Sequence, residues 1–205
     1  MKNIKYLLFL FALNVCLSAQ AEISYSRELE EIFSKLDNMI LQREEYRLKK
    51  EERIKMLRNR IDMRASLEER FHTNKVLYEE YYVYNADSAM AYVTENLRIA
   101  SLLKRKDWEY TWKINKSFLL SATGLLKEAE DELKDIPVQK LSDNAKVDYY
   151  SQMQYLLSHF SQYTGSESEA VQRSYLDKEL LYRDSVYMVA HPDHPLYLWY
   201  KGCKL

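Results

Sequence analysis

Apolar residues recur at intervals of three and four along most of this 205-residue chain, the spacing of one face of an α-helix. The first such stretch is apolar along one face at its start and strongly charged in its middle. There is no proline before Pro137 and no glycine before Gly124. Because turn-rich β proteins depend on both residues, their absence favours long helices. We predict a long charged N-terminal helix within residues 22–65.

Residues 66–190 predict three helix hairpins of about 40 residues each. Ser66 and Glu69 have the spacing of a capping box, which marks the start of the first hairpin. Residues 191–205 hold only the start of a further helix. We therefore expect a truncated final unit with an uncovered apolar end.

Three alanines mark the recurrence. Ala89, Ala129 and Ala170 are 40 and 41 residues apart, and Gly124 and Gly165 lie five residues before the second and third. A period of this length on a helical chain is typical of stacked helix pairs, and a small alanine lets paired helices approach closely. We expect an all-α solenoid in which these five residues form the repeat turns. Such arrays usually bind partners and rarely perform chemistry.

Part of the repeat resembles a known motif. The turn and second helix of a tetratricopeptide repeat are matched by Gly124, Leu126, Glu128, Ala129, Leu133 and Ile136. The same turn is matched by Gly165, Glu169 and Ala170. The resemblance implies irregular tetratricopeptide-like helix hairpins, because the first helix of each unit departs from the usual pattern and the spacing is longer.

A narrower resemblance covers more of the chain. It rests on Leu36, Asp37, Arg43, Tyr46, Lys50, Glu51, Arg53, Ile54, Leu57, Leu77, Tyr78, Tyr81, Asp87, Ser88, Ala89, Tyr92, Asn96, Leu97 and Ala100. With these residues the chain resembles an uncharacterised exported family of Bacteroidetes, whose members are often labelled sensors or transcriptional regulators. The resemblance implies the extracytoplasmic input part of a sensor, without its membrane-spanning and output regions, and it implies no activity.

The N-terminus has the pattern of a signal peptide. Lys2 and Lys5 precede an apolar stretch, and Ala19 and Ala21 fit the small residues of a cleavage site. We predict a signal peptide at residues 1–21 and export to the periplasm or cell envelope of a Gram-negative bacterium. Membrane contact is expected only through this segment. Whether Cys16 is lipidated stays open.

Charge and reactive residues exclude several classes of function. Without residues 1–21 the chain keeps 28 basic and 31 acidic side chains, a net of −3, which argues against nucleic acid. The only metal-like cluster is His191, Asp193 and His194, and a polar turn explains it better. We expect no metal, no cofactor, no catalytic residue and no enzyme activity.

The 18 tyrosines are the unusual feature of the composition. Most suit core packing, but Tyr82 and Tyr149 point away from the inferred inner faces, so we expect both on a contact surface. At the C-terminal end, Leu196, Trp199 and Tyr200 are expected to bind a partner or mediate self-association. The leading hypothesis is recognition of a protein or peptide partner. The alternative is a small-molecule or glycan sensor that uses exposed tyrosines.

Overall fold

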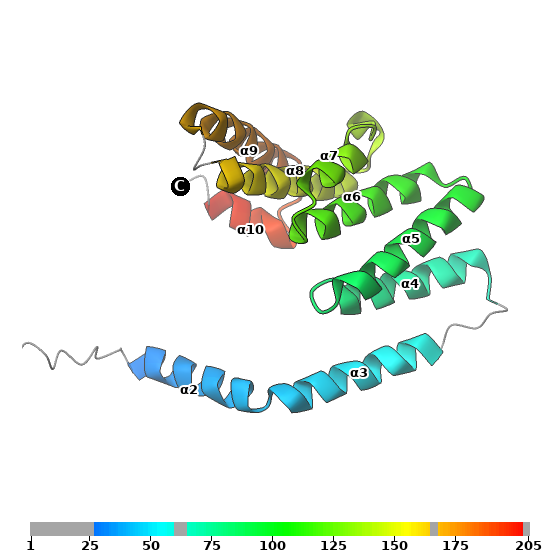
Figure 1. The fold of residues 1–205 in the computed structure, drawn as a ribbon, viewed down its shortest axis with the longest axis vertical. Helices are drawn as coiled ribbons and strands as arrows, with labels where there is room; N and C mark the ends of the chain where they lie inside the picture. Colours follow the sequence, from blue (N-terminus) through cyan, green and yellow to red (C-terminus); the bar gives the residue numbers. More distant parts are fainter. Residues whose placement is uncertain (1–26, 60–64, 165–167, 203–205) are drawn as a thin grey trace, which may run out of the picture. The chain divides into compact units, whose positions relative to one another are not determined.

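The computed structural model describes residues 27–59, 65–164 and 168–202, and every regular element in these ranges is helical. This confirms the prediction of an all-α solenoid (Figure 1). The helices are α2 (Arg27–Leu41), α3 (Arg43–Asn59), α4 (Leu67–Tyr81), α5 (Ala86–Leu102), α6 (Lys106–Ala122), α7 (Leu126–Leu133), the short 3₁₀ helix η1 (Val138–Lys140), α8 (Asp143–Thr164), α9 (Glu169–Val189) and α10 (Pro195–Gly202).

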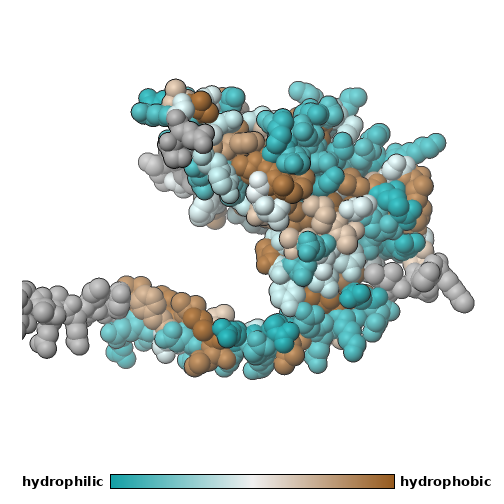
Figure 2. Space-filling view, in the orientation of Figure 1, coloured by the Kyte–Doolittle hydropathy of each residue, from teal (hydrophilic) through white to brown (hydrophobic). Residues whose placement is uncertain are grey.

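The chain divides into two compact units, residues 1–51 and 52–205. In the first, the single long helix expected at residues 22–65 is interrupted. A turn at Gln42 separates α2 from α3, although Gln42 still donates to the Asn38 carbonyl at 3.1 Å. Figure 2 shows apolar side chains along one face of α2. That face is exposed and consists of Leu29, Ile32, Phe33, Leu36, Met39 and Ile40.

The second unit holds three hairpins, α4 with α5, α6 with α7, and α8 with α9, followed by α10. Local capping fixes where the first hairpin begins and turns. Glu69 N donates to Ser66 Oγ at 3.2 Å, and Ser66 N donates to the Glu69 carboxylate at 2.8 Å, which completes the expected capping box. Asn85 Oδ1 accepts from Ser88 N at 2.8 Å and caps α5.

A left-handed residue ends α6, as the sequence predicted. Gly124 has φ +85°, and the chain closes through hydrogen bonds from Leu125 N to Leu120 O and from Gly124 N to Ser121 O. Lys104 does the same after α5 with φ 55°, although a side chain makes this conformation less favourable than it is for glycine. The helix connections are therefore short and fixed by backbone hydrogen bonds.

Three buried clusters connect neighbouring helices of the second unit. The first gathers Ile54, Phe71, Leu77, Val93 and Trp112 from α3 to α6. The second lies among α6, α7 and α8, and the third joins α8, α9 and α10. Each cluster uses helices that follow one another in sequence, as is typical of repeat proteins, in which stability comes from packing against the next unit.

The repeat alanines differ in their environments. Ala89 and Ala129 are completely buried, as the close approach of paired helices requires. Ala170 is exposed, so its expected role in a repeat turn is wrong. The physical reason is that α9 packs mainly on α8 and α10, and Val186 is its one buried residue in the described part of the chain. The α9 cap is Ser168, whose Oγ accepts from Val171 N, while Gly165 lies outside the described residues.

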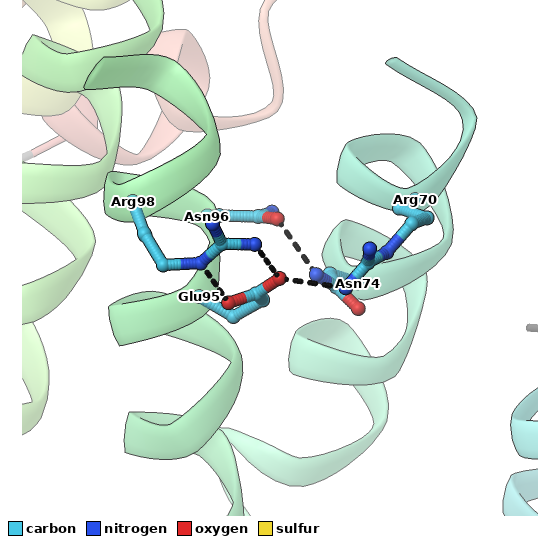
Figure 3. A network of polar contacts seen from close by, with 5 residues as sticks. All are labelled: Arg70, Asn74, Glu95, Asn96 and Arg98. Carbon is cyan, nitrogen blue, oxygen red and sulfur yellow. Dashed lines mark hydrogen bonds and ion pairs between the residues drawn. The ribbon is translucent and has the colours of Figure 1, made fainter. Parts of the chain in front are cut away.

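Polar groups also join the two helices of the first hairpin (Figure 3). Asn74 on α4 donates to Asn96 Oδ1 at 3.0 Å, and Asn96 donates to the Phe71 carbonyl at 3.0 Å, all in the buried interior. Nearer the surface, the Glu95 carboxylate binds Arg70 at 2.9 Å and Arg98 at 2.7 Å. The hydrogen bond from Arg98 is the main cause that holds the pKa of Glu95 below its ordinary value.

We predict that Ala129→Leu lowers the free energy of unfolding by about 1–3 kcal/mol, because the added atoms overpack the α6–α7 approach. Chemical denaturation measures this change. Ala170→Leu is the matched control: its exposed site should keep the free energy within about 0.5 kcal/mol of the parent. Equal effects of the two substitutions would contradict the burial of Ala129.

We predict that Asn96→Ala destabilises the fold by about 1–3 kcal/mol, because Asn74 and the Phe71 carbonyl both lose a buried hydrogen bond. The same denaturation experiment detects the loss. Asn144→Ala removes an exposed amide on α8 and should be close to neutral. An unchanged free energy of unfolding in Asn96→Ala would show that water replaces the buried hydrogen bonds.

Candidate functional site

The first helices of the three hairpins, α4, α6 and α8, line a groove of about 540 Å³ in the second unit. Part of α10 contributes to its wall. This volume lies within the range of sites that hold small molecules or short segments of chain. The contributing residues are Lys75, Tyr78 and Glu79 from α4 and its C-cap Tyr82, Thr111, Ile114, Asn115 and Phe118 from α6, Asp148, Ser151, Gln152, Gln154 and Tyr155 from α8, and Leu196 and Tyr200 from α10.

Aromatic rings cross the groove in one row. Tyr82 lies 6.0 Å from Phe118, and Phe118 lies 5.4 Å from Tyr155, measured between ring centroids. Tyr78 stacks on Tyr82 at 5.8 Å and continues the row along α4. We call Tyr82, Phe118 and Tyr155 the aromatic row. It forms an apolar part of the groove lining, with one ring from each hairpin.

Amide and hydroxyl groups occupy the next turn of the helices. Gln152 is buried, and its Nε2 donates to Ser117 Oγ and Ser121 Oγ, both at 3.0 Å. These two hydrogen bonds to α6 fix the orientation of the Gln152 side chain. Asn115 Oδ1 accepts a long hydrogen bond of 3.5 Å from the Tyr78 hydroxyl. Burial raises the pKa of Tyr78, so this phenol stays protonated and remains a donor.

Charged groups lie one turn further along. Lys75 and Glu79 form an ion pair on α4 at 3.9 Å. On α8, Asp148 is open to water along the groove, yet nearby protein atoms partly desolvate its carboxyl group. Desolvation therefore raises the Asp148 pKa above its ordinary value, against the attraction of His194 and Lys75.

Two consecutive side-chain hydrogen bonds hold helix α10 against α8 and α9. The Tyr200 hydroxyl donates to Gln154 Oε1 at 3.1 Å, and Gln154 Nε2 donates to the Glu179 carboxylate at 2.8 Å. The ring of Tyr200 also packs with Val147 and Val186 in the third cluster. The wall formed by Leu196 and Tyr200 is thus part of the folded unit.

Tyr82 and Tyr149, both expected on a contact surface, lie in different environments. Tyr82 is 40% exposed and lines the groove. The expectation that Tyr149 points outward is wrong: it is 8% exposed, and burial raises its pKa to about 12. The reason is that α8 packs against α6, α7 and α9, so more than one of its faces is internal.

The C-terminal residues also differ from the expectation of an uncovered end. Tyr200 is 5% exposed and Leu196 is half-buried, because α10 folds onto the third hairpin. Trp199 is 69% exposed and Leu198 is 73% exposed, so both remain open to water.

The His191–His194 loop has an evident structural role. The His191 imidazole accepts a hydrogen bond from Asp193 N at 3.3 Å, and the His194 imidazole accepts one from Leu196 N at 3.2 Å. Within the described ranges, no three His, Cys, Asp or Glu side chains gather closely enough to hold a metal ion. Cys16 and Cys203 lie outside these ranges.

Sequence reasoning missed most of the groove, although a signal was present. Tyr82, Phe118 and Tyr155 are spaced by 36 and 37 residues, and so are Lys75, Thr111 and Asp148. This second recurrence follows the inner faces of the first helices. It was hidden because neither set repeats a single residue type at all three positions, whereas the alanine recurrence does.

These hairpins and their groove define a helical-repeat protein of the tetratricopeptide type. The family model described as the SusR N-terminal TPR domain matches residues 40–205. The chain belongs to this family and is a helical-repeat region of the SusR-like sensor or regulator type. No curated protein and no solved structure matches the chain. In the part that the structure describes, no helix is both long and apolar enough to cross a membrane.

Proposed function

We propose that this chain is the input region of a SusR-like regulator and recognises a protein or peptide partner in the groove of α4, α6 and α8. The observation that carries the proposal is the aromatic row, which presents one ring from each hairpin beside amide side chains. Rings accept the side chains of an extended segment, and amides satisfy its backbone N–H and C=O groups. Helical-repeat arrays are also well suited to such binding, because they offer long concave surfaces.

A second candidate is a small molecule or glycan as the recognised ligand. The groove volume of about 540 Å³ and the wall contributed by α10 favour it, because a partly closed site suits a compact ligand. Ring faces next to amides and hydroxyls also suit a molecule with apolar faces and hydroxyl groups. A pull-down from envelope extract, combined with a thermal-shift screen of glycans and metabolites, separates the two candidates.

Export belongs to the same proposal. The N-terminal pattern of Lys2, Lys5, Ala19 and Ala21 supports secretion with cleavage after Ala21, and the recognised partner would then lie in the periplasm or envelope. Mass spectrometry of the mature N-terminus from the native host tests the cleavage site. The same measurement reports a lipid on Cys16.

We predict that Tyr82→Ala weakens binding of the captured partner by about tenfold, because the aromatic row loses its α4 ring. Isothermal titration calorimetry measures the change. The matched control is Tyr163→Ala, which removes a 65% exposed tyrosine outside the groove and should leave affinity unchanged. If both variants bind like the parent, the groove is not the recognition surface.

Self-association through residues 196–205 stays a prediction, now narrowed to the exposed side of α10. We expect the double variant Leu198→Ser, Trp199→Ser to be more monomeric than the parent, since both apolar side chains face water. Sedimentation velocity over a range of concentrations measures this. A parent chain that is monomeric throughout would rule the association out.

A further inference from the structure

The groove contains a carboxylate that no described residue engages. Asp148 on α8 forms no hydrogen bond or ion pair with any residue in the described ranges. The neighbours that counter the raised pKa of Asp148 are His194 and Lys75, and Lys75 is already paired with Glu79 at 3.9 Å. At this end of the groove the carboxylates of Asp148 and Glu79 therefore outnumber the single ammonium of Lys75.

A second polar group on the same face also lacks a partner. Ser151 is one turn from Asp148 and lines the same groove, and its buried Oγ has no hydrogen-bond partner. Several other helical hydroxyls donate to the carbonyl four residues earlier, as Thr111 does to Asp107 at 3.1 Å and Ser121 does to Ser117 at 2.8 Å. Ser151 does not, so its hydrogen-bonding capacity is left for another group.

We propose that the groove binds a cationic nitrogen group of its ligand, an ammonium or a guanidinium, at Asp148 and Ser151, while an apolar part of the ligand lies on the aromatic row. This inference rests on the proposed function and adds the chemistry of the ligand. Unpaired carboxylate and hydroxyl oxygens accept hydrogen bonds from N–H donors, and the carboxylate also supplies the opposite charge.

The spacing along α8 limits the ligand further. Asp148 and Tyr155 are seven residues apart, which corresponds to about 10 Å along a helix axis. The ligand must therefore carry its cationic nitrogen and its apolar group about 10 Å apart. A lysine or arginine side chain or the amino terminus of a peptide satisfies this chemistry, and so does a free amine with an apolar body.

The energetics of Asp148 agree with a binding role. Desolvation raises its pKa, so ionisation of this carboxyl group is less favourable in the folded chain than in water and costs stability at neutral pH. A carboxylate that stabilises the fold would have a partner and a lowered pKa. Asp148→Asn should therefore keep or raise the thermal unfolding midpoint at neutral pH.

Three matched peptides test the proposal with the full chain: acetyl-Tyr-Ala-Lys-amide, its neutral norleucine analogue and its glutamate analogue. Binding is followed by ¹⁵N–¹H NMR titration of α8 resonances. The lysine peptide should bind about five- to tenfold more tightly than the norleucine peptide, and the glutamate peptide least tightly. Asp148→Asn should abolish this preference. The control Asp177→Asn, which removes an exposed carboxylate on α9, should retain it.

A further titration with cadaverine, a free diamine, identifies the source of the cation. Perturbation of the same α8 resonances by cadaverine supports the proposal with a small amine as ligand, and perturbation by the lysine peptide alone supports it with a peptide. Equal affinities of the lysine and norleucine peptides overturn the cationic site but leave the groove as a binding surface. A lysine preference that survives Asp148→Asn also overturns the cationic site. If no probe perturbs α8 at millimolar concentration, both the cationic site and the proposed function fail.

Discussion

The close packing of each helix on its sequence neighbours is the constraint on which the rest of the second unit depends. Ala129 contributes no more than a methyl group to its buried contact, and this lets the short helix α7 lie near α6. From the other side, α8 is fixed to α6 by Gln152, which binds Ser117 and Ser121. Since the groove is formed by further faces of α6 and α8, its shape follows from these core contacts.

The groove combines three kinds of chemistry in an ordered way. Along α8 the ring of Tyr155 is followed one turn away by Gln152 and Ser151 and then by Asp148, because residues three and four apart share a helix face. Polar side chains in the middle turn are partly used by the fold, as Gln152 is, and partly left without partners, as Ser151 is. This mixture is typical of a site that is formed before its ligand arrives.

Two features of the second unit lower stability without contributing to packing. Lys104 adopts a left-handed conformation in a turn where glycine would be less strained, and Asp148 is partly desolvated without an ion-pair partner. Only the second lines the groove. Local conflicts of this kind gather at functional sites in folded proteins, and for that reason the unpaired carboxylate has more functional meaning than the strained turn.

The sequence by itself determined the helical class, the repeat architecture, the Ser66 cap and the left-handed turn at Gly124. These depend on neighbouring residues: helix periodicity, capping pairs and the conformational freedom of glycine act over a few positions of chain. The environments of Ala170, Tyr149 and Tyr200 were decided only by the tertiary structure. A helix pattern shows which residues share a face, but not how many of its faces are covered, and α8 is covered on several sides while α9 is not. The groove is tertiary for the same reason, because its walls come from helices 36 and 37 residues apart that meet only when the hairpins stack.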